Sequence, residues 1–279
     1  MERRPWPTAA MIWTCALGGC ALLGGCMSLD AKGHAQRLAQ AAGLHEVLVR
    51  ADPFVLTSFF RVSRIDQPID IYIEGDGRAW LSRTQPSADP TPRRALALQL
   101  AVRDPAPNVV YLARPCQFTK DDRLCNRDYW TGKRYSAEVI GAMDEAVSHY
   151  ASLAPGQPIN LIGYSGGGAV SILVAARRTD IASIRTVAGN LDVDEVVRLH
   201  GVTPMPASIN PLSEARQVAG IPQIHFSGGL DTTVPPSIAA RFAMVAGGSC
   251  VQTRIIPGLK HEGNWPRLWP QMLAETVHC

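Results

Sequence analysis

Short apolar runs alternate with longer segments of helical periodicity over most of the chain. The strand-like runs, rich in Val, Ile and aromatic residues, occupy residues 54–60, 69–74, 109–112, 158–162, 184–188, 223–227 and 251–256. Apolar residues spaced three or four apart predict helices over residues 95–102, 136–153, 169–178, 237–246 and 270–277. Because strands and helices alternate, we expect an α/β fold whose mostly parallel central sheet carries helices on both faces.

The segment before the first predicted strand has a different character. It is polar and rich in alanine, with Leu38, Ala42 and Leu44 at loosely helical spacing. We expect a tether and a short helix over residues 26–50, followed by a single body over residues 51–279. A chain of 279 residues is long enough for one large domain with a sizeable core.

The N-terminus has the three parts of an export signal. Arg3 and Arg4 precede an apolar run over residues 9–25 that ends in small residues before Cys26. The ending Leu-Leu-Gly-Gly-Cys resembles the bacterial lipobox. That resemblance implies a lipoprotein signal peptide over residues 1–25 and a lipidated Cys26 as the mature N-terminus.

Other interpretations of this segment stay open. Cys20 ends a second, weaker match to the lipobox, and the segment could also be an ordinary cleaved signal or an uncleaved anchor helix. Met27 follows Cys26, where an Asp would resemble an inner-membrane retention signal. We therefore expect a lipid-anchored protein of the bacterial cell envelope, at the outer membrane and facing the periplasm.

Composition and charge limit the classes of molecule that the protein is expected to bind. The whole chain of 279 residues is 46% hydrophobic with a formal net charge of only +3, and its arginines are scattered. No basic stripe interleaves with aromatic residues, so the sequence gives no support for nucleic-acid binding.

Apart from Cys15, Cys20 and Cys26 the chain has four cysteines, namely Cys116, Cys125, Cys250 and Cys279. In an exported protein they predict two disulfides, for which three connectivities are possible. We favour local pairing of Cys116 with Cys125 and of Cys250 with Cys279, and four buried free thiols are the alternative. No pair has Cys-x-x-Cys spacing and no His cluster lies nearby, so a metal site is not expected.

The candidate chemistry centres on a Gly-x-Ser-x-Gly motif around Ser165. An apolar strand-like run leads into Gly163-Tyr164-Ser165-Gly166-Gly167, and a helical segment follows. This strand–turn–helix setting is the one that a nucleophile elbow requires. From about residue 54 to its end the chain resembles the α/β-hydrolase family, which implies that Ser165 is a catalytic nucleophile.

The resemblance also implies a catalytic acid and a histidine that follow Ser165 in chain order. Asp231 comes just after the strand predicted over residues 223–227, and His261 comes just after the last predicted strand. His261 would deprotonate Ser165, and Asp231 would hold the useful tautomer. Asp192 and Asp194 are alternative acids, because some family members place the acid after the preceding strand.

The same resemblance points to two oxyanion-hole donors, the backbone N–H groups of Gly166 and Asp76. Asp76 lies in Glu74-Gly75-Asp76-Gly77, where Glu74 replaces the histidine usual in the family. A carboxylate aimed at an oxyanion would oppose catalysis. We therefore expect both acidic side chains to turn away, toward Arg78, Arg83 or Arg114. A plain turn is the alternative.

Two other segments bear on the expected pocket. Only a short stretch separates the strands predicted over residues 184–188 and 223–227, so we expect a minimal lid and an open, modest pocket. Residues 114–134 should form a loop over the site, rigidified by the first disulfide. Tyr129 and Trp130 could line the pocket or fill a minor core.

Together these features predict a membrane-tethered, extracytoplasmic serine hydrolase that cleaves an ester through an acyl-enzyme. The expected partners are a small-molecule acyl substrate and a membrane reached through the lipid anchor, and no metal or organic cofactor is required. A peptidase or amidase using the same triad, or a non-catalytic envelope lipoprotein with this fold, are the alternatives.

Overall fold

The computed structural model describes residues 1–2, 31–119 and 123–279. Residues Ala31–Cys279 form one compact unit. Residues 3–25 of the expected signal peptide, which include Cys20, and the expected lipidation site Cys26 lie outside the described residues. In the described parts of the chain, no helix is long and apolar enough to cross a membrane.

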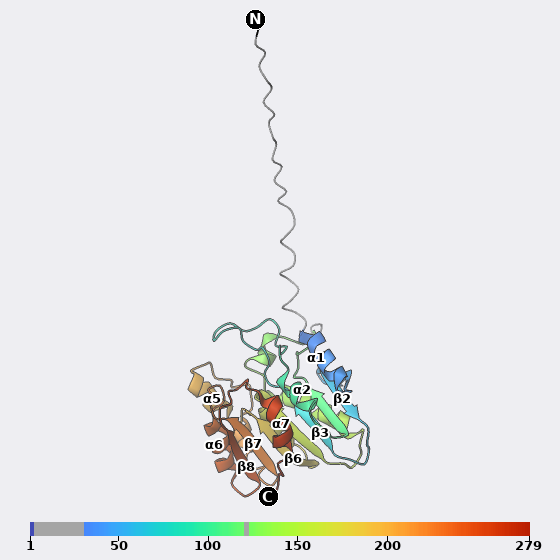
Figure 1. The fold of residues 1–279 in the computed structure, drawn as a ribbon. Coiled ribbons are helices and arrows are strands. Elements are labelled where there is room, and N and C mark those ends of the chain that lie inside the picture. Colours follow the sequence, from blue (N-terminus) through green and yellow to red (C-terminus); the bar gives the residue numbers. More distant parts are fainter. Residues whose placement is uncertain (3–30, 120–122) are drawn as a thin grey trace. The chain divides into compact units, whose positions relative to one another are not determined.

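A single eight-stranded sheet in the order β1-β2-β4-β3-β5-β6-β7-β8 forms the centre of the compact unit (Figure 1). Strand β2 runs antiparallel to both β1 and β4, and the remaining neighbours are parallel. The strands are β1 (His45–Ala51), β2 (Phe54–Val62), β3 (Ile69–Ile73), β4 (Asn108–Leu112), β5 (Ile159–Tyr164), β6 (Ile181–Val187), β7 (Gln223–Gly228) and β8 (Val251–Ile256). The predicted mostly parallel sheet is confirmed.

Helices cover both faces of the sheet, as the alternating pattern predicts. The helices are α1 (Ala31–Ala41), α2 (Leu96–Ala101), α3 (Ala137–Ala151), α4 (Gly166–Ala175), α5 (Val193–His200), α6 (Pro236–Ala246) and α7 (Trp265–Leu273), with short 3-10 segments η1 (Arg127–Trp130) and η2 (Pro211–Glu214). Helices α3, α4, α5 and α6 contribute to the hydrophobic core on one face. Helices α1, α2 and α7 contribute to a second core on the other face (Figure 1).

Alternation along β3 shows how one strand serves both cores. Ile69, Ile71 and Ile73 belong to the core under α3 and α4, whereas Tyr72 belongs to the core under α2 and α7. Successive side chains of a strand point to opposite faces, so a central strand buried on both sides carries apolar residues at consecutive positions, here Ile71, Tyr72 and Ile73.

The sheet begins earlier than the sequence pattern predicts. Residues 45–50 were expected to belong to the tether and short helix, but His45–Ala51 form strand β1, paired with β2 at the edge of the sheet. Its inner face buries Val49 and Ala51, while Glu46 and Arg50 are partly or fully exposed. An edge strand tolerates such charged residues, which is why the segment resembles a polar linker.

The closing helix also begins earlier than predicted, at Trp265 rather than at residue 270. Pro266 lies in its first turn, where a missing N–H costs little, and Pro270 lies inside the helix. The helix nevertheless continues because Trp265, Trp269 and Met272 are buried on one stripe against the sheet. Tertiary packing thus overrides the local preference of proline.

The two-sided burial of β3 gives a stability prediction. Replacing Ile71 with Ala should lower the free energy of unfolding by about 2–5 kcal/mol, because the side chain is fully buried and its removal leaves a cavity. The matched variant Ile65→Ala removes a side chain that is 72% exposed, and should change stability by less than about 0.5 kcal/mol. Urea unfolding of both variants checks this, and equal losses would contradict the assigned core.

Candidate active site

Ser165 lies in the tight turn between β5 and α4. Its backbone has φ 50° and ψ −118°, and this positive φ is strained for a non-glycine residue. The turn is close-packed: a Cβ on Gly163 would lie 2.3 Å from the Gly167 carbonyl oxygen, and one on Gly167 would lie 2.1 Å from that of Ile73. Both motif glycines are therefore required by this close approach, and the nucleophile-elbow geometry is present.

His261 lies within hydrogen-bonding distance of Ser165 and Asp231 together. Its Nε2 is 2.9 Å from Ser165 Oγ, and its Nδ1 is 2.8 Å from Asp231 Oδ2. Its carbonyl oxygen accepts a hydrogen bond of 2.8 Å from the Trp265 indole N–H, which anchors the loop after β8 to α7. The three predicted residues are thus brought together at the carboxyl edge of β5, β7 and β8.

The Asp231 carboxylate is fully buried and held from two sides. Its Oδ1 accepts hydrogen bonds of 2.8 Å from the N–H groups of Thr233 and Val234, which leaves Oδ2 to face His261. With the carboxylate fixed, Nδ1 of His261 carries the proton and Nε2 is free to accept the hydroxyl proton of Ser165.

The alternative acids have other partners. Asp192 caps the first turn of α5 by accepting the Glu195 N–H, and pairs with Arg241 at 2.8 Å. Asp194 accepts a hydrogen bond of 3.0 Å from the side-chain amide of Asn210. Of the three candidate acids, Asp231 is the one that forms a hydrogen bond with His261.

The loop after β3 lies directly against Ser165. A Cβ on Gly75 would be 3.2 Å from the Ser165 Cβ. Among the described residues, neither the N–H of Asp76 nor that of Gly166 donates a hydrogen bond. Gly166 begins α4, where first-turn amides have no partner within the helix. Both predicted donors are therefore available to an acceptor beside Ser165.

The Asp76 side chain is bound within a cluster of cations. Its carboxylate accepts hydrogen bonds of 3.3 Å from Arg114, 3.0 Å from Arg134 and 3.0 Å from the Tyr135 hydroxyl. It also packs against Gly166, since a Cβ there would be 2.1 Å from Asp76 Oδ1. The expected partner Arg114 is confirmed.

Neither Arg78 nor Arg83 forms an ion pair or side-chain hydrogen bond with Asp76, contrary to one expectation. Arg83 donates instead to the backbone carbonyl of His200 at 2.6 Å. Arg134 and Tyr135 take their place because the 114–134 loop folds back over the turn, an arrangement that no local pattern in the sequence indicates.

Glu74 also turns away from the site, but no arginine pairs with it. It is buried, and its carboxylate accepts hydrogen bonds from the N–H groups of Gly75 at 2.9 Å and Ala97 at 3.4 Å, and from the Tyr111 hydroxyl at 3.2 Å. The expectation of an arginine partner is wrong for Glu74, because its side chain points into the protein toward α2. Burial raises the pKa of this carboxyl to about 7.

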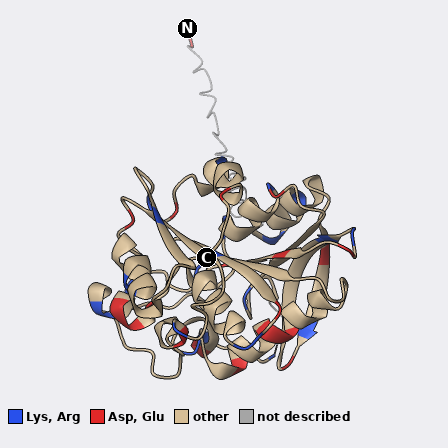
Figure 2. Ribbon diagram, turned by 90° about the horizontal axis from the view of Figure 1, so that it is seen from below, with Lys and Arg blue, Asp and Glu red and all other residues tan. Residues whose placement is uncertain are grey.

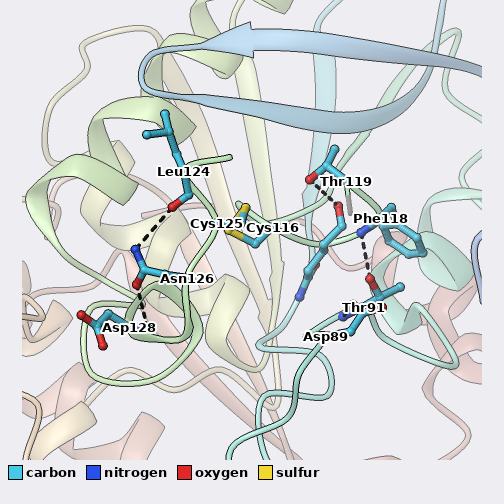
Figure 3. The surroundings of a disulfide bond; sticks show 10 residues. Asp89, Thr91, Cys116, Phe118, Thr119, Leu124, Cys125, Asn126 and Asp128 are labelled. Carbon is cyan, nitrogen blue, oxygen red and sulfur yellow. Dashed lines mark hydrogen bonds between the residues drawn. A yellow bond between two sulfur atoms is a disulfide. The ribbon is translucent and has the colours of Figure 1, made fainter. Parts of the chain in front are cut away.

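Both predicted disulfides are present. Cys116–Cys125 closes part of the 114–134 loop, with Cα atoms 5.4 Å apart (Figure 3). Around it, the Thr91 hydroxyl accepts the Phe118 N–H at 2.9 Å, which joins this loop to the segment before α2. Cys250–Cys279 ties the start of β8 to the C-terminus.

Trp130 and Tyr129 of the 114–134 loop pack in hydrophobic clusters and do not line the pocket over Ser165. Trp130 packs with Ala79 and Cys116, and its indole N–H donates to the Ser87 carbonyl at 3.2 Å. Tyr129 packs edge-to-face on Phe54, with ring centroids 4.8 Å apart. Neither residue lines the cavity over Ser165, but with Asp76, Arg114 and Arg134 they line a small space of about 10 Å³.

A cavity of about 940 Å³ lies over Ser165 and His261. Its walls come from the loop after β3, the segment just before α2, and the loops that carry Asp231 and His261. Within residues 31–119 and 123–279, no group of three His, Cys, Asp or Glu residues is placed to hold a metal ion.

No protein-family model matches the sequence, and no curated protein matches it either. Solved structures do match. An esterase from Pyrococcus furiosus is 14% identical with a TM-score of 0.60, over 84% of this chain and 92% of that one. An alpha-beta serine hydrolase homologue from Coxiella burnetii is 13% identical with a TM-score of 0.57, over 82% and 97%.

A third match is the acylaminoacyl peptidase of Pyrococcus horikoshii, 12% identical with a TM-score of 0.58, over 82% of this chain but 40% of that one. The chain has the α/β-hydrolase fold. At these identities the matches establish the fold, while the chemistry has to be argued from the site.

The buried Glu74 gives a prediction about pH and stability. Between the ordinary pKa of 4.5 and about 7, the folded protein keeps a proton that the unfolded chain has released, so stability falls as pH rises through this window. Glu74→Gln cannot titrate and can still accept the two amides. Between pH 5 and pH 8, the wild type should lose on the order of 2 kcal/mol more unfolding free energy than the variant.

Urea unfolding at the two pH values measures this difference. Burial also raises the pKa of Asp70 to about 7, but Asp70 is present in both proteins, so its contribution cancels in the comparison. Identical pH dependences for wild type and Glu74→Gln would refute the assignment of a proton to Glu74.

Proposed function

We propose that the protein is a serine hydrolase that cleaves carboxylic esters. The observation that carries this proposal is the pair of contacts made by His261, 2.9 Å to Ser165 Oγ and 2.8 Å to Asp231. Three residues far apart in sequence lie side by side in the order serine, imidazole, carboxylate. They lie at the strand ends where proteins of this fold have their catalytic residues.

The proposed reaction has two halves. Ser165 Oγ attacks the ester carbonyl carbon while its proton passes to His261 Nε2. The tetrahedral intermediate then collapses, and the imidazolium protonates the departing alkoxide. The alcohol leaves, and the acyl group remains on Ser165 as an ester. In the second half a water gives its proton to Nε2 and attacks the acyl carbon, and Ser165 recovers its proton as the carboxylic acid leaves.

The oxyanion of each intermediate would accept hydrogen bonds from the free N–H groups of Gly166 and Asp76. Two features support this role. The first turn of α4 directs the positive end of its dipole toward this point, and the cations on Asp76 hold the loop that carries the second donor.

An ester is favoured over an amide as substrate. The esterase from Pyrococcus furiosus matches along 92% of its own length, whereas the acylaminoacyl peptidase matches along 40%, so most of that peptidase has no counterpart in this sequence. An amidase that uses the same triad is the second candidate.

We further propose that the body is exported and anchored by a lipid on Cys26, at the outer membrane and facing the periplasm. The lipobox-like ending of the N-terminal apolar run supports this location. The two disulfides support export as well, since such bonds persist in oxidising compartments.

A covalent probe tests the nucleophile. A fluorophosphonate should label the wild-type protein at Ser165, because the hydroxyl is activated by His261, and should not label Ser165→Ala. Gel fluorescence and the mass of the labelled peptide measure the result. A folded wild-type protein that takes up no label, or equal labelling of the variant, would overturn the hydrolase proposal.

The choice of acid gives a second prediction. Asp231→Asn should lower kcat/KM for a p-nitrophenyl ester by on the order of 10³–10⁴, because the amide no longer stabilises the required tautomer and the imidazolium. The control Asp194→Asn makes the same chemical change at an exposed residue and should keep the wild-type rate within about twofold. Comparable losses in both variants would reject Asp231 as the acid.

A further inference from the structure

The cavity over Ser165 is surrounded by cationic side chains. Arg78, Arg93, Arg94 and Lys260 all line it, and all four are exposed. Elsewhere on the body, basic and acidic positions are interspersed, as the view in Figure 2 shows. The formal net charge of the whole chain is only +3, so four cations at one cavity are a local concentration.

These cations are not used to hold the protein together. Among the described residues, none of the four side chains takes part in an ion pair, and none donates a side-chain hydrogen bond. Arg114, by contrast, is buried and forms an ion pair with Asp76. Clustered like charges repel one another, so an arrangement without internal partners is suited to an external anion.

The acidic residues of the cavity do not cancel this charge. Glu74 is buried and bonded to backbone amides, and Asp76 is already paired with Arg114 and Arg134. Glu262 is the exposed acidic residue of the cavity wall. The surface that faces a substrate therefore has an excess of positive charge.

We infer that the substrate is an ester that carries a carboxylate or phosphate group close to the scissile carbonyl; this inference rests on the proposed hydrolase function. Arg78 follows the loop of the second oxyanion donor, and Arg93 and Arg94 precede α2 on the same cavity. Lys260 is adjacent to His261 on the loop after β8. All four share one cavity with Ser165, so an anionic group of a substrate bound there would meet this cationic wall.

Guanidinium groups suit this role because they bind carboxylate and phosphate with paired N–H donors. Trp80, which is 41% exposed, also lines the cavity and offers an apolar surface beside the charges. The wall thus fits an anionic group attached to a short apolar stem.

Matched pairs of esters test the inference. On the acyl side, mono-p-nitrophenyl adipate is compared with p-nitrophenyl hexanoate. On the alcohol side, 4-acetoxybenzoate is compared with its methyl ester. For the wild type, kcat/KM for the anionic member should exceed that of the neutral member by about tenfold or more in at least one pair, and the ratio should fall as salt screens the cations. Rates with Ser165→Ala are subtracted as the background.

The double variant Arg93→Gln/Arg94→Gln should lose most of that preference. The control Arg50→Gln/Arg216→Gln removes the same charge at exposed residues outside the cavity wall and should keep the preference. No preference in either pair, or an equal preference in both double variants, would overturn the inference while leaving the hydrolase proposal intact. Absence of Ser165-dependent hydrolysis of all four esters would instead overturn the proposed function, and the inference with it.

Discussion

The close approach of the β5–α4 turn to the end of β3 is the constraint on which the site depends. Gly163 pairs with Ile73 across neighbouring parallel strands, and Gly167 rests on the Ile73 carbonyl with no room for a side chain. This contact fixes three things at once: the exposed hydroxyl of Ser165, the first turn of α4, and the position of the loop after β3. The backbone strain at Ser165 costs on the order of 1–3 kcal/mol. The packing of α4 and of the central strands, which are buried, holds the residue in this conformation.

A second constraint follows from the acidic residue in that loop. A carboxylate at Asp76 beside a developing oxyanion would oppose catalysis, yet its side chain is bound by Arg114, Arg134 and Tyr135. Those partners lie on or next to the 114–134 loop, which the Cys116–Cys125 disulfide closes. A Cβ on Gly166 would be only 2.1 Å from Asp76 Oδ1. Like Gly163 and Gly167, this position of the turn therefore has no room for a side chain. The disulfide loop and the nucleophile turn are therefore coupled through one side chain.

Much of the fold and site could be predicted because it depends on local sequence signals. Ser165 follows β5 directly, Asp231 lies three residues after β7 and His261 five residues after β8, and parallel strands bring their carboxyl ends to one edge. Features set by long-range packing could not be predicted in this way. Strand β1 is half exposed and resembles a linker, and α7 begins at Trp265 because two tryptophans are buried against the sheet. The pairing of Asp76 with Arg134 joins residues 58 positions apart and leaves no local pattern.

The charges around Ser165 form a consistent electrostatic arrangement. Both acidic residues of the loop after β3 are prevented from projecting negative charge into the cavity, one by burial that raises its pKa to about 7 and the other by ion pairs. Among the described residues of the cavity, the exposed cations without ion pairs and the first turn of α4 would then act on a bound molecule. Their positive field favours the oxyanion that Ser165 would generate, and it favours an anionic ground state as well. A positive field shared by both states would strengthen binding, whereas the two N–H groups would act mainly on the charge that develops in the proposed reaction. The cationic wall and the two N–H groups would therefore make separable contributions to KM and kcat.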